Sequence, residues 1–371
     1  MDAHRGSCCM RRAAGGDFVD NQRVSVFKQN NRWGLTVLCT VLCIVASPLL
    51  SSLVFMPQVV TMVPVLLLVM LGFVGPVSAA VCAGLLTGGA AVLYGAWGAV
   101  CAAILIVPTV AAAAITLDRD QPFWESVVAG SVAMFASLFA AVAIISMLAG
   151  SDVVSALSSL LTDVAASVES YSDTLLGTLA SMGLLTLPEG VSDIVSLDAE
   201  ARKELFRSLI LTMDSVLRLE LPMQMATGAV SAGLLGQAAL RKGMLRRGVK
   251  VAYPKLSTWR VPKGWGRILG GTLVVLYLLA MLLPERMNTM FYVFSGVFDR
   301  VFALQGIAAV CYLLKKHGKS VKLQALVFVI GYFFMGTAAM IVGIADQSMD
   351  FTHRREELNE IENPFDPRTL V

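Results

Sequence analysis

Residues 33–117 read WGLTVLCTVLCIVASPLLSSLVFMPQVVTMVPVLLLVMLGFVGPVSAAVCAGLLTGGAAVLYGAWGAVCAAILIVPTVAAAAITL, a stretch without any Asp, Glu, Lys, Arg or His. A soluble helix or strand of this length would need a polar face toward water, so the stretch must lie in lipid. A helix needs roughly 20 apolar residues to cross a bilayer, and the stretch therefore holds about four crossings. It predicts an all-α fold, a polytopic transmembrane helical bundle.

The composition of the whole chain agrees with that class. Of its 371 residues, 56% are hydrophobic and 15% are charged, whereas ordinary globular domains carry about 25% charged residues. The net charge of +3 is too small to predict a nucleic-acid partner. Most of the seven cysteines lie in apolar runs, where Cys behaves as a small hydrophobe, so no disulfide framework is expected.

Proline and glycine positions mark the ends of the predicted spans, because Pro suits the first turn of a helix and interrupts its interior. Spans one to five occupy residues 33–149, at 33–55, 57–72, 75–94, 96–115 and 124–148. Spans six to nine occupy residues 204–345, at 205–240 with a break at Pro222, 268–283, 287–314 and 323–345.

Four segments outside the spans have distinct compositions. Residues 1–32 form a basic tail that we expect to be disordered, and residues 346–371 form a polar, mainly acidic tail. The loop 241–267 is rich in Lys and Arg and has no acid. Residues 150–203 are mainly acidic and repeat apolar residues at steps of three and four, which predicts an amphipathic helical insert rather than a span.

The basic segments set the expected orientation, since cytoplasmic loops are enriched in Lys and Arg. The N-terminal tail, the loop 241–267 and the link 315–322 should all face the cytoplasm. Nine spans place all three basic segments on the cytoplasmic side. We expect the protein to lie in the cytoplasmic (inner) membrane of a bacterium. The insert 150–203 and the C-terminal tail then lie outside, the tail only if the last span crosses fully.

Asp299 and Arg300 are the sharpest local feature, because they lie near the middle of the eighth span. An ionisable residue at that depth costs at least about 2.5–3.5 kcal/mol, so it is normally paired or faces water. Adjacent residues point about 100° apart on a helix, so each needs a partner elsewhere. The pair is a candidate ligand-binding or proton-binding site, or else a structural contact between helices.

Other polar residues could line a site near the spans. Asp214 and Arg218 have the spacing of an intrahelical ion pair and, with Glu220, could line a vestibule or simply form a solvated helix end. Uncharged amides at or inside spans could bind a ligand or link helices; they are Gln58, Gln224, Gln237 and Gln305.

Small residues recur every four positions in spans three and four. The pairs are Ala79/Ala83, Gly84/Gly88 and Ala99/Ala103. Such pairs let helices approach closely in lipid. We favour packing within the bundle, and docking to another membrane subunit is the alternative.

No motif of an enzyme, metal site or cofactor site is present. The sequence has no HExxH and no GxxxxGK[ST], and its histidines, His4, His317 and His353, lie outside the spans. We therefore expect no catalytic activity, metal or cofactor. The basic loop 241–267 could contact anionic lipid head groups, although the positive-inside rule alone explains its charge.

The second half of the chain resembles the YybS-like family of bacterial multi-pass membrane proteins. The likeness covers residues 33–355 and depends on Leu221-Pro222, Arg246-Arg247-Gly248, Trp259-Arg260-Val261-Pro262, Leu304-Gln305-Gly306, Gly343-Ile344-Ala345-Asp346 and Asp350-Phe351. That family is related in fold to the substrate-binding subunits of energy-coupling-factor transporters. The resemblance implies a module that binds a small solute and has no ATPase of its own.

Two classes of function therefore remain open. The first is a small-solute binding or transport subunit, which should hold a polar-lined pocket among the later spans, open to the outside. The second is a membrane scaffold or regulator of a partner complex, which should be packed solid, with its small-residue faces turned outward.

Overall fold

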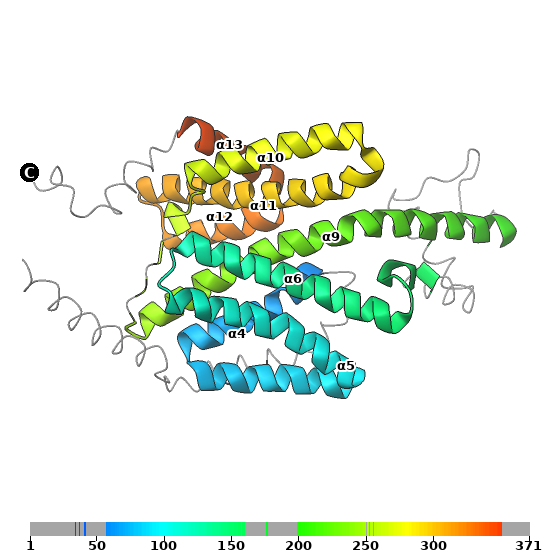
Figure 1. The fold of residues 1–371 in the computed structure, drawn as a ribbon. Helices are drawn as coiled ribbons and strands as arrows, with labels where there is room; N and C mark the ends of the chain where they lie inside the picture. The colour runs from blue at the N-terminus through cyan, green and yellow to red at the C-terminus, as the bar shows by residue number, and fades with distance from the viewer. Residues whose placement is uncertain are drawn as a thin grey trace, which may run out of the picture. The chain divides into compact units, whose positions relative to one another are not determined.

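The computed structural model describes residues 57–156, 199–249 and 256–350, together with residues 34, 37, 41, 158, 159, 176, 251, 253 and 254. The two tails, most of the first predicted span and most of the insert 150–203 lie outside the described residues. Within this part the structure is helical, without strands (Figure 1). The longer helices are α4 (Met62–Phe73), α5 (Pro76–Asp118), α6 (Phe123–Ala149), α9 (Ala199–Arg246), α10 (Lys263–Leu282), α11 (Pro284–Lys316), α12 (Val321–Phe333) and α13 (Gly336–Met349).

Several of these helices could cross a membrane. Four are long and apolar enough among the described residues: α5, α6, α10 and α11. The pair α12–α13 adds a fifth if it counts as one span, and the helical stretch Pro57–Phe73 is apolar but shorter. The polytopic membrane class is thereby supported, and the count of nine spans stays a prediction.

Helix α5 contains two arms that meet at Gly95, as the boundary between spans three and four predicts. Gly95 has φ 72° and ψ −167°, values that interrupt a helix and favour glycine. The ribbon of α5 turns back on itself there (Figure 1), and Cys82 and Leu86 of one arm pack in the same apolar cluster as Ile106 of the other. Each arm is close to the roughly 20 residues that a crossing needs.

Helix α9 differs from the expectation at Pro222. The sequence predicts a break at this proline, whereas α9 is continuous from Ala199 to Arg246 with Pro222 inside it. A proline removes one backbone hydrogen bond of a helix, and the other bonds on both sides of Pro222 hold the helix together.

The last predicted span, 323–345, is divided in the structure. Helices α12 and α13 are bent by 109° at the short break after Phe333. Helix α12 packs along α11, where the Cys311 thiol lies 3.5 Å from the Gln324 carbonyl oxygen. Helix α13 then ends beside the segment before α10, where Asp350 accepts a hydrogen bond from Arg260. The C-terminal tail, which the nine-span arrangement places outside, therefore starts next to the loop 241–267, which the charge rule places in the cytoplasm. These two expected placements conflict.

Helices α11 and α13 cross with their backbones nearly in contact. A Cβ atom at Gly306 would lie 1.8 Å from the Ala339 carbonyl oxygen, and one at Gly343 would lie 1.9 Å from that of Phe302. Neither obstacle is a flexible side chain, so only glycine fits at both positions. This crossing holds α13 against α11 at the level of Gln305.

Replacing either glycine of this crossing with alanine should destabilise the protein. We expect Gly306→Ala and Gly343→Ala each to cost about 1–3 kcal/mol, because the helices must move apart. Gly84→Ala is the matched control, since no atom lies within 4 Å of its Cβ position. Thermal unfolding of the purified protein in detergent measures the effect, and equal melting temperatures for all three variants would contradict the close crossing.

Candidate functional site

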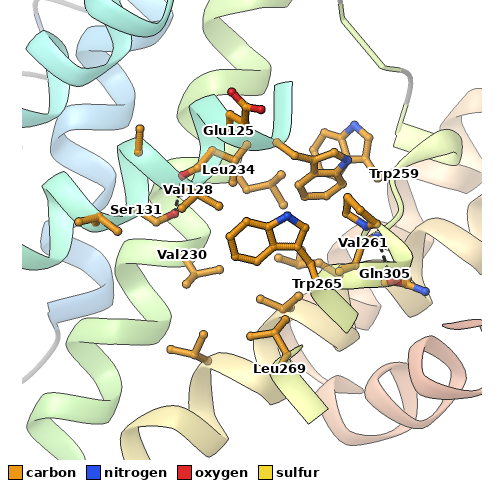
Figure 2. A pocket seen from close by; sticks show the side chains of 18 of the residues that line it. Glu125, Val128, Ser131, Val230, Leu234, Trp259, Val261, Trp265, Leu269 and Gln305 are labelled. Carbon is orange, nitrogen blue, oxygen red and sulfur yellow. Dashed lines mark hydrogen bonds between the residues drawn. The ribbon is translucent and has the colours of Figure 1, made fainter. Parts of the chain in front are cut away.

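A cavity of about 810 Å³ lies among α6, α9, the start of α10 and α11. Figure 2 shows the Trp265 indole at its centre, with Val128 and Ser131 on one side and Val261 and Gln305 on the other. Most of the other lining residues are apolar, including Trp124, Trp259, Val230, Leu234, Leu269 and Leu304. A volume of roughly 300–1,000 Å³ is typical of sites that hold a small molecule.

The cavity has a buried back and an exposed rim. Leu234, Trp259, Val261, Leu304 and Gln305 are all less than 9% exposed and form the back. The rim includes exposed apolar side chains, which are Val128 and Val132 of α6 and Trp265 of α10. Both helices of the rim are candidate membrane spans.

Gln305 connects the cavity to α13. Its Oε1 accepts a hydrogen bond from the Val261 backbone N–H at 3.1 Å. Its Nε2 donates to the Gly343 carbonyl oxygen at 3.2 Å, to Gln347 Oε1 at 3.0 Å and to Asp346 Oδ2 at 3.3 Å. A buried amide with this many partners is held rigidly, so the back wall is fixed relative to α13.

Behind Gln305 lies a buried ion pair. The side chain of Arg260 is 4% exposed and that of Asp346 is fully buried. Arg260 donates from Nη2 to the Asp346 carbonyl oxygen at 2.6 Å and from Nη1 to the Asp350 carboxylate, and its Nε lies 3.9 Å from Asp346 Oδ2. We call Arg260, Gln305, Asp346, Gln347 and Asp350 the polar cluster; it ties the segment before α10 to α11 and α13.

A second buried arginine fixes the start of α6. Arg241, at the end of α9, is 2% exposed. Its Nη2 donates to the Gln121 carbonyl oxygen at 2.8 Å and to Ser126 Oγ at 2.6 Å, and its guanidinium lies 5.7 Å from the Phe123 ring centroid. These contacts position the first turn of α6, which carries Trp124 into the cavity wall.

The structure does not bring Asp299 and Arg300 into the cavity. Asp299 is exposed on α11 and has no hydrogen bond or ion pair among the described residues. Arg300 lies over the Tyr332 ring of α12, 4.9 Å from its centroid. Of the predicted ligand-binding residues, Gln305 lines the cavity, whereas Asp299, Arg300, Asp214, Arg218 and Glu220 do not.

Asp214 and Arg218 form the predicted intrahelical ion pair, at 2.8 Å. Arg218 also contacts Asp152 at 2.6 Å and Ser155 Oγ at 2.6 Å, so α9 is linked to the start of the acidic region. Desolvation opposes ionisation of Asp152, but hydrogen bonds from the Ser155 N–H and from Arg218 outweigh it and lower the pKa of this carboxyl. Glu220 is half-buried on the same helix.

The uncharged amides have different environments. Gln58 donates to Gln224 Oε1 at 2.5 Å and to Thr227 Oγ1 at 3.2 Å, which links the short helix Pro57–Val60 to α9. Gln237 is 1% exposed, and neither its nitrogen nor its oxygen has a hydrogen-bond partner in the described part of the chain.

The small-residue pairs differ in their surroundings: one pair packs inside the bundle, and another lies on an open face of α5. Ala79 and Ala83 pack against the apolar cluster formed by α4 and α5, as internal packing predicts. Gly84 and Gly88 have no atom within 4 Å of their Cβ positions, so this face of α5 is open within the described residues. Ala99 and Ala103 are half-buried in the second arm of α5.

Apart from Gln305, the sequence does not predict the polar cluster. Arg260 lies in the basic loop 241–267, whose charge the positive-inside rule alone explains, and Asp346 lies at the start of the polar tail. Two signals in the sequence point to it: Ala339 and Gly343 have the four-residue spacing of a close helix crossing, and Arg260 lies between Trp259 and Val261 in a mainly apolar segment.

The described residues contain no group of three or more His, Cys, Asp or Glu side chains that could hold a metal ion.

Several apolar helices of membrane-spanning length, with the buried pair of Arg260 and Asp346 among the described residues, define a polytopic integral membrane protein. The chain matches the family described as "Predicted membrane protein (DUF2232)" over residues 35–347, and it belongs to that family. No curated protein and no solved structure matches it.

Two Asp→Asn variants compare how much the buried Asp346 carboxylate and the exposed Asp299 carboxylate contribute to stability. Asp346→Asn should lower the free energy of unfolding by about 1–3 kcal/mol, because it removes one of the two carboxylates beside the buried Arg260 while Asp350 remains. Asp299→Asn is the matched control and should leave stability unchanged, since no described partner loses a contact. Chemical or thermal unfolding in detergent measures both, and a larger loss for Asp299→Asn would contradict the assignment of the structural pair.

Proposed function

We propose that the protein is a small-solute binding or transport-related subunit of the bacterial cytoplasmic membrane, without catalytic activity of its own. The cavity beside Trp265 is the observation that carries this proposal. Its volume suits a small molecule, and a buried back formed by α9, α11 and the segment before α10 gives the preorganised wall that specific binding requires.

The YybS-like resemblance supports the same reading. Its motifs at 259–262, 304–306 and 343–346 are the segments that meet in the polar cluster behind the cavity. By analogy with energy-coupling-factor transporters, the energy for any transport step would come from a separate ATPase, and the sequence itself has no GxxxxGK[ST] phosphate-binding loop. Analogy of fold is a weaker argument than the cavity.

A membrane scaffold is the second candidate, and the open face of α5 favours it. Gly84 and Gly88 lie on the same face as Val77 and Val81, which are 63% and 54% exposed. Another membrane subunit could pack closely on this face. The two functions are compatible, because the face of α5 and the cavity use different helices.

Filling the cavity tests the first proposal. Val301→Phe places a ring in the cavity from α11, and Val92→Phe at a position that is 86% exposed is the matched control. We expect a small molecule to co-purify with the wild type and with Val92→Phe, and to be absent from Val301→Phe at an unchanged melting temperature. Mass spectrometry of solvent extracts measures it, and equal contents in all three proteins would refute the cavity as its site.

We also propose that α12 and α13 form a re-entrant pair, so that eight helices cross the membrane and both chain ends are cytoplasmic. Helix α12 follows the basic link 315–322, and α13 returns to Arg260 of the basic loop. The acidic insert stays extracytoplasmic in this arrangement. It replaces the nine-span arrangement, in which the C-terminal tail lies outside.

A reporter fused after Val371 tests this topology. Green fluorescent protein should fluoresce there, and alkaline phosphatase should be inactive, because both results require a cytoplasmic fusion point. The same reporters inserted at Pro188 of the acidic insert should give the opposite pattern. An active phosphatase at the C-terminus would restore the nine-span arrangement.

A further inference from the structure

The polar side chains around the cavity leave little for a polar ligand to bind. Ser131 Oγ already donates to the Val127 carbonyl oxygen at 2.8 Å. Gln305 uses its oxygen and its nitrogen on the backbone and on α13. Figure 2 shows the Glu125 carboxylate at the edge of the cavity, pointing away from the Trp265 indole. Gln121 and the indole N–H groups of Trp124 and Trp265 are the other polar groups of a mainly apolar wall, so a sugar, a nucleotide or an inorganic ion would lose more hydration than these few groups replace.

The apolar wall continues onto the surface of the protein at the rim. Val128 is 43% exposed, Val132 is 63% exposed and Trp265 is 51% exposed. These side chains belong to helices that are candidate spans, so the exposed rim lies against lipid chains when the protein is in a bilayer. The polar side chains at the edge, Gln121 and Glu125, lie just before and within the first turn of α6, whereas Val128 and Val132 lie further along the helix.

The position of the rim along the helices agrees with the edge of the hydrocarbon core. Trp124 and Trp265 lie in the first turns of α6 and α10, and indoles concentrate at the boundary between lipid chains and head groups. The basic loop 241–267 directly precedes α10, which places this boundary on the cytoplasmic side by the charge rule.

From this geometry we infer that the cavity opens sideways into the cytoplasmic leaflet and binds an apolar chain or ring system that partitions into the bilayer. The inference rests on the proposed function, because it names the ligand class of the same cavity. The ligand enters between Val132 of α6 and Trp265 of α10 and contacts the buried Trp259. A phospholipid tail and a free lipophilic solute share this chemistry, and the experiment separates them.

Fluorescence quenching by bromine tests the inference, because bromine on an acyl chain quenches an indole that it contacts. One protein keeps Trp265 as its only tryptophan and reports on the rim; another keeps Trp259 and reports on the buried back. The remaining tryptophans become phenylalanine, and melting temperatures confirm that both proteins fold. One arm uses vesicles of brominated phosphatidylcholine, and the other adds a brominated free fatty acid to vesicles of ordinary phosphatidylcholine.

We expect brominated chains to quench both tryptophans in at least one arm. Val301→Phe in the Trp259 protein should remove the quenching of Trp259, and the same substitution should leave Trp265 quenched in its own protein. Quenching of Trp259 by brominated phosphatidylcholine identifies a lipid tail. Quenching of Trp259 by the free fatty acid alone identifies a lipophilic solute that is not a structural lipid.

The opposite results overturn the inference. Trp265 quenched and Trp259 unaffected in both arms would mean that apolar chains reach the rim and do not enter. If Val301→Phe then still displaces a co-purified molecule, the proposed function stands with a different ligand class. If no molecule depends on the cavity either, both proposals fail. Quenching of Trp259 that persists in Val301→Phe would place the chain outside the cavity and also overturn the inference.

Discussion

Arg260 lies buried against Asp346 and Asp350, and the arrangement of the last three helices depends on this contact. A guanidinium removed from water needs counter-charges and hydrogen-bond acceptors, and the hydrocarbon core of a bilayer offers neither. The carboxylates come from the end of α13, and Gln305 of α11 binds the same aspartate. Three segments far apart in the sequence are thereby held together. The bend between α12 and α13 follows, since α13 must return to Arg260.

Close backbone packing complements the ion pair. Gly306 and Gly343 allow α11 and α13 to touch at the level of the polar cluster, and a side chain at either position would push Asp346 away from Gln305. Packing is the main attraction between helices in lipid, because lipid tails are as apolar as the helix surfaces. The crossing and the polar cluster therefore support each other, and together they form a rigid back for the cavity.

The two aspartates of this region show why depth in a span is a poor guide to a site. Asp299 lies near the middle of a predicted span, which suggested a partner or a ligand, yet it is exposed on α11 without a partner among the described residues. Asp346 lies at the end of a predicted span, where a carboxylate costs little, yet it is buried against Arg260. Partners are decided by which helices meet, and sequence position along one helix does not reveal that.

The sequence by itself determined the membrane class and the turn at Gly95, because both depend on local hydropathy and on the backbone preferences of Gly and Pro. It also predicted the Asp214–Arg218 pair, since residues four apart on a helix are neighbours. It marked Gln305 as a candidate without its partners. Only the tertiary structure decided the polar cluster, the bend before α13 and the cavity, because these join α6, α9, α10, α11 and α13 across long separations in the chain.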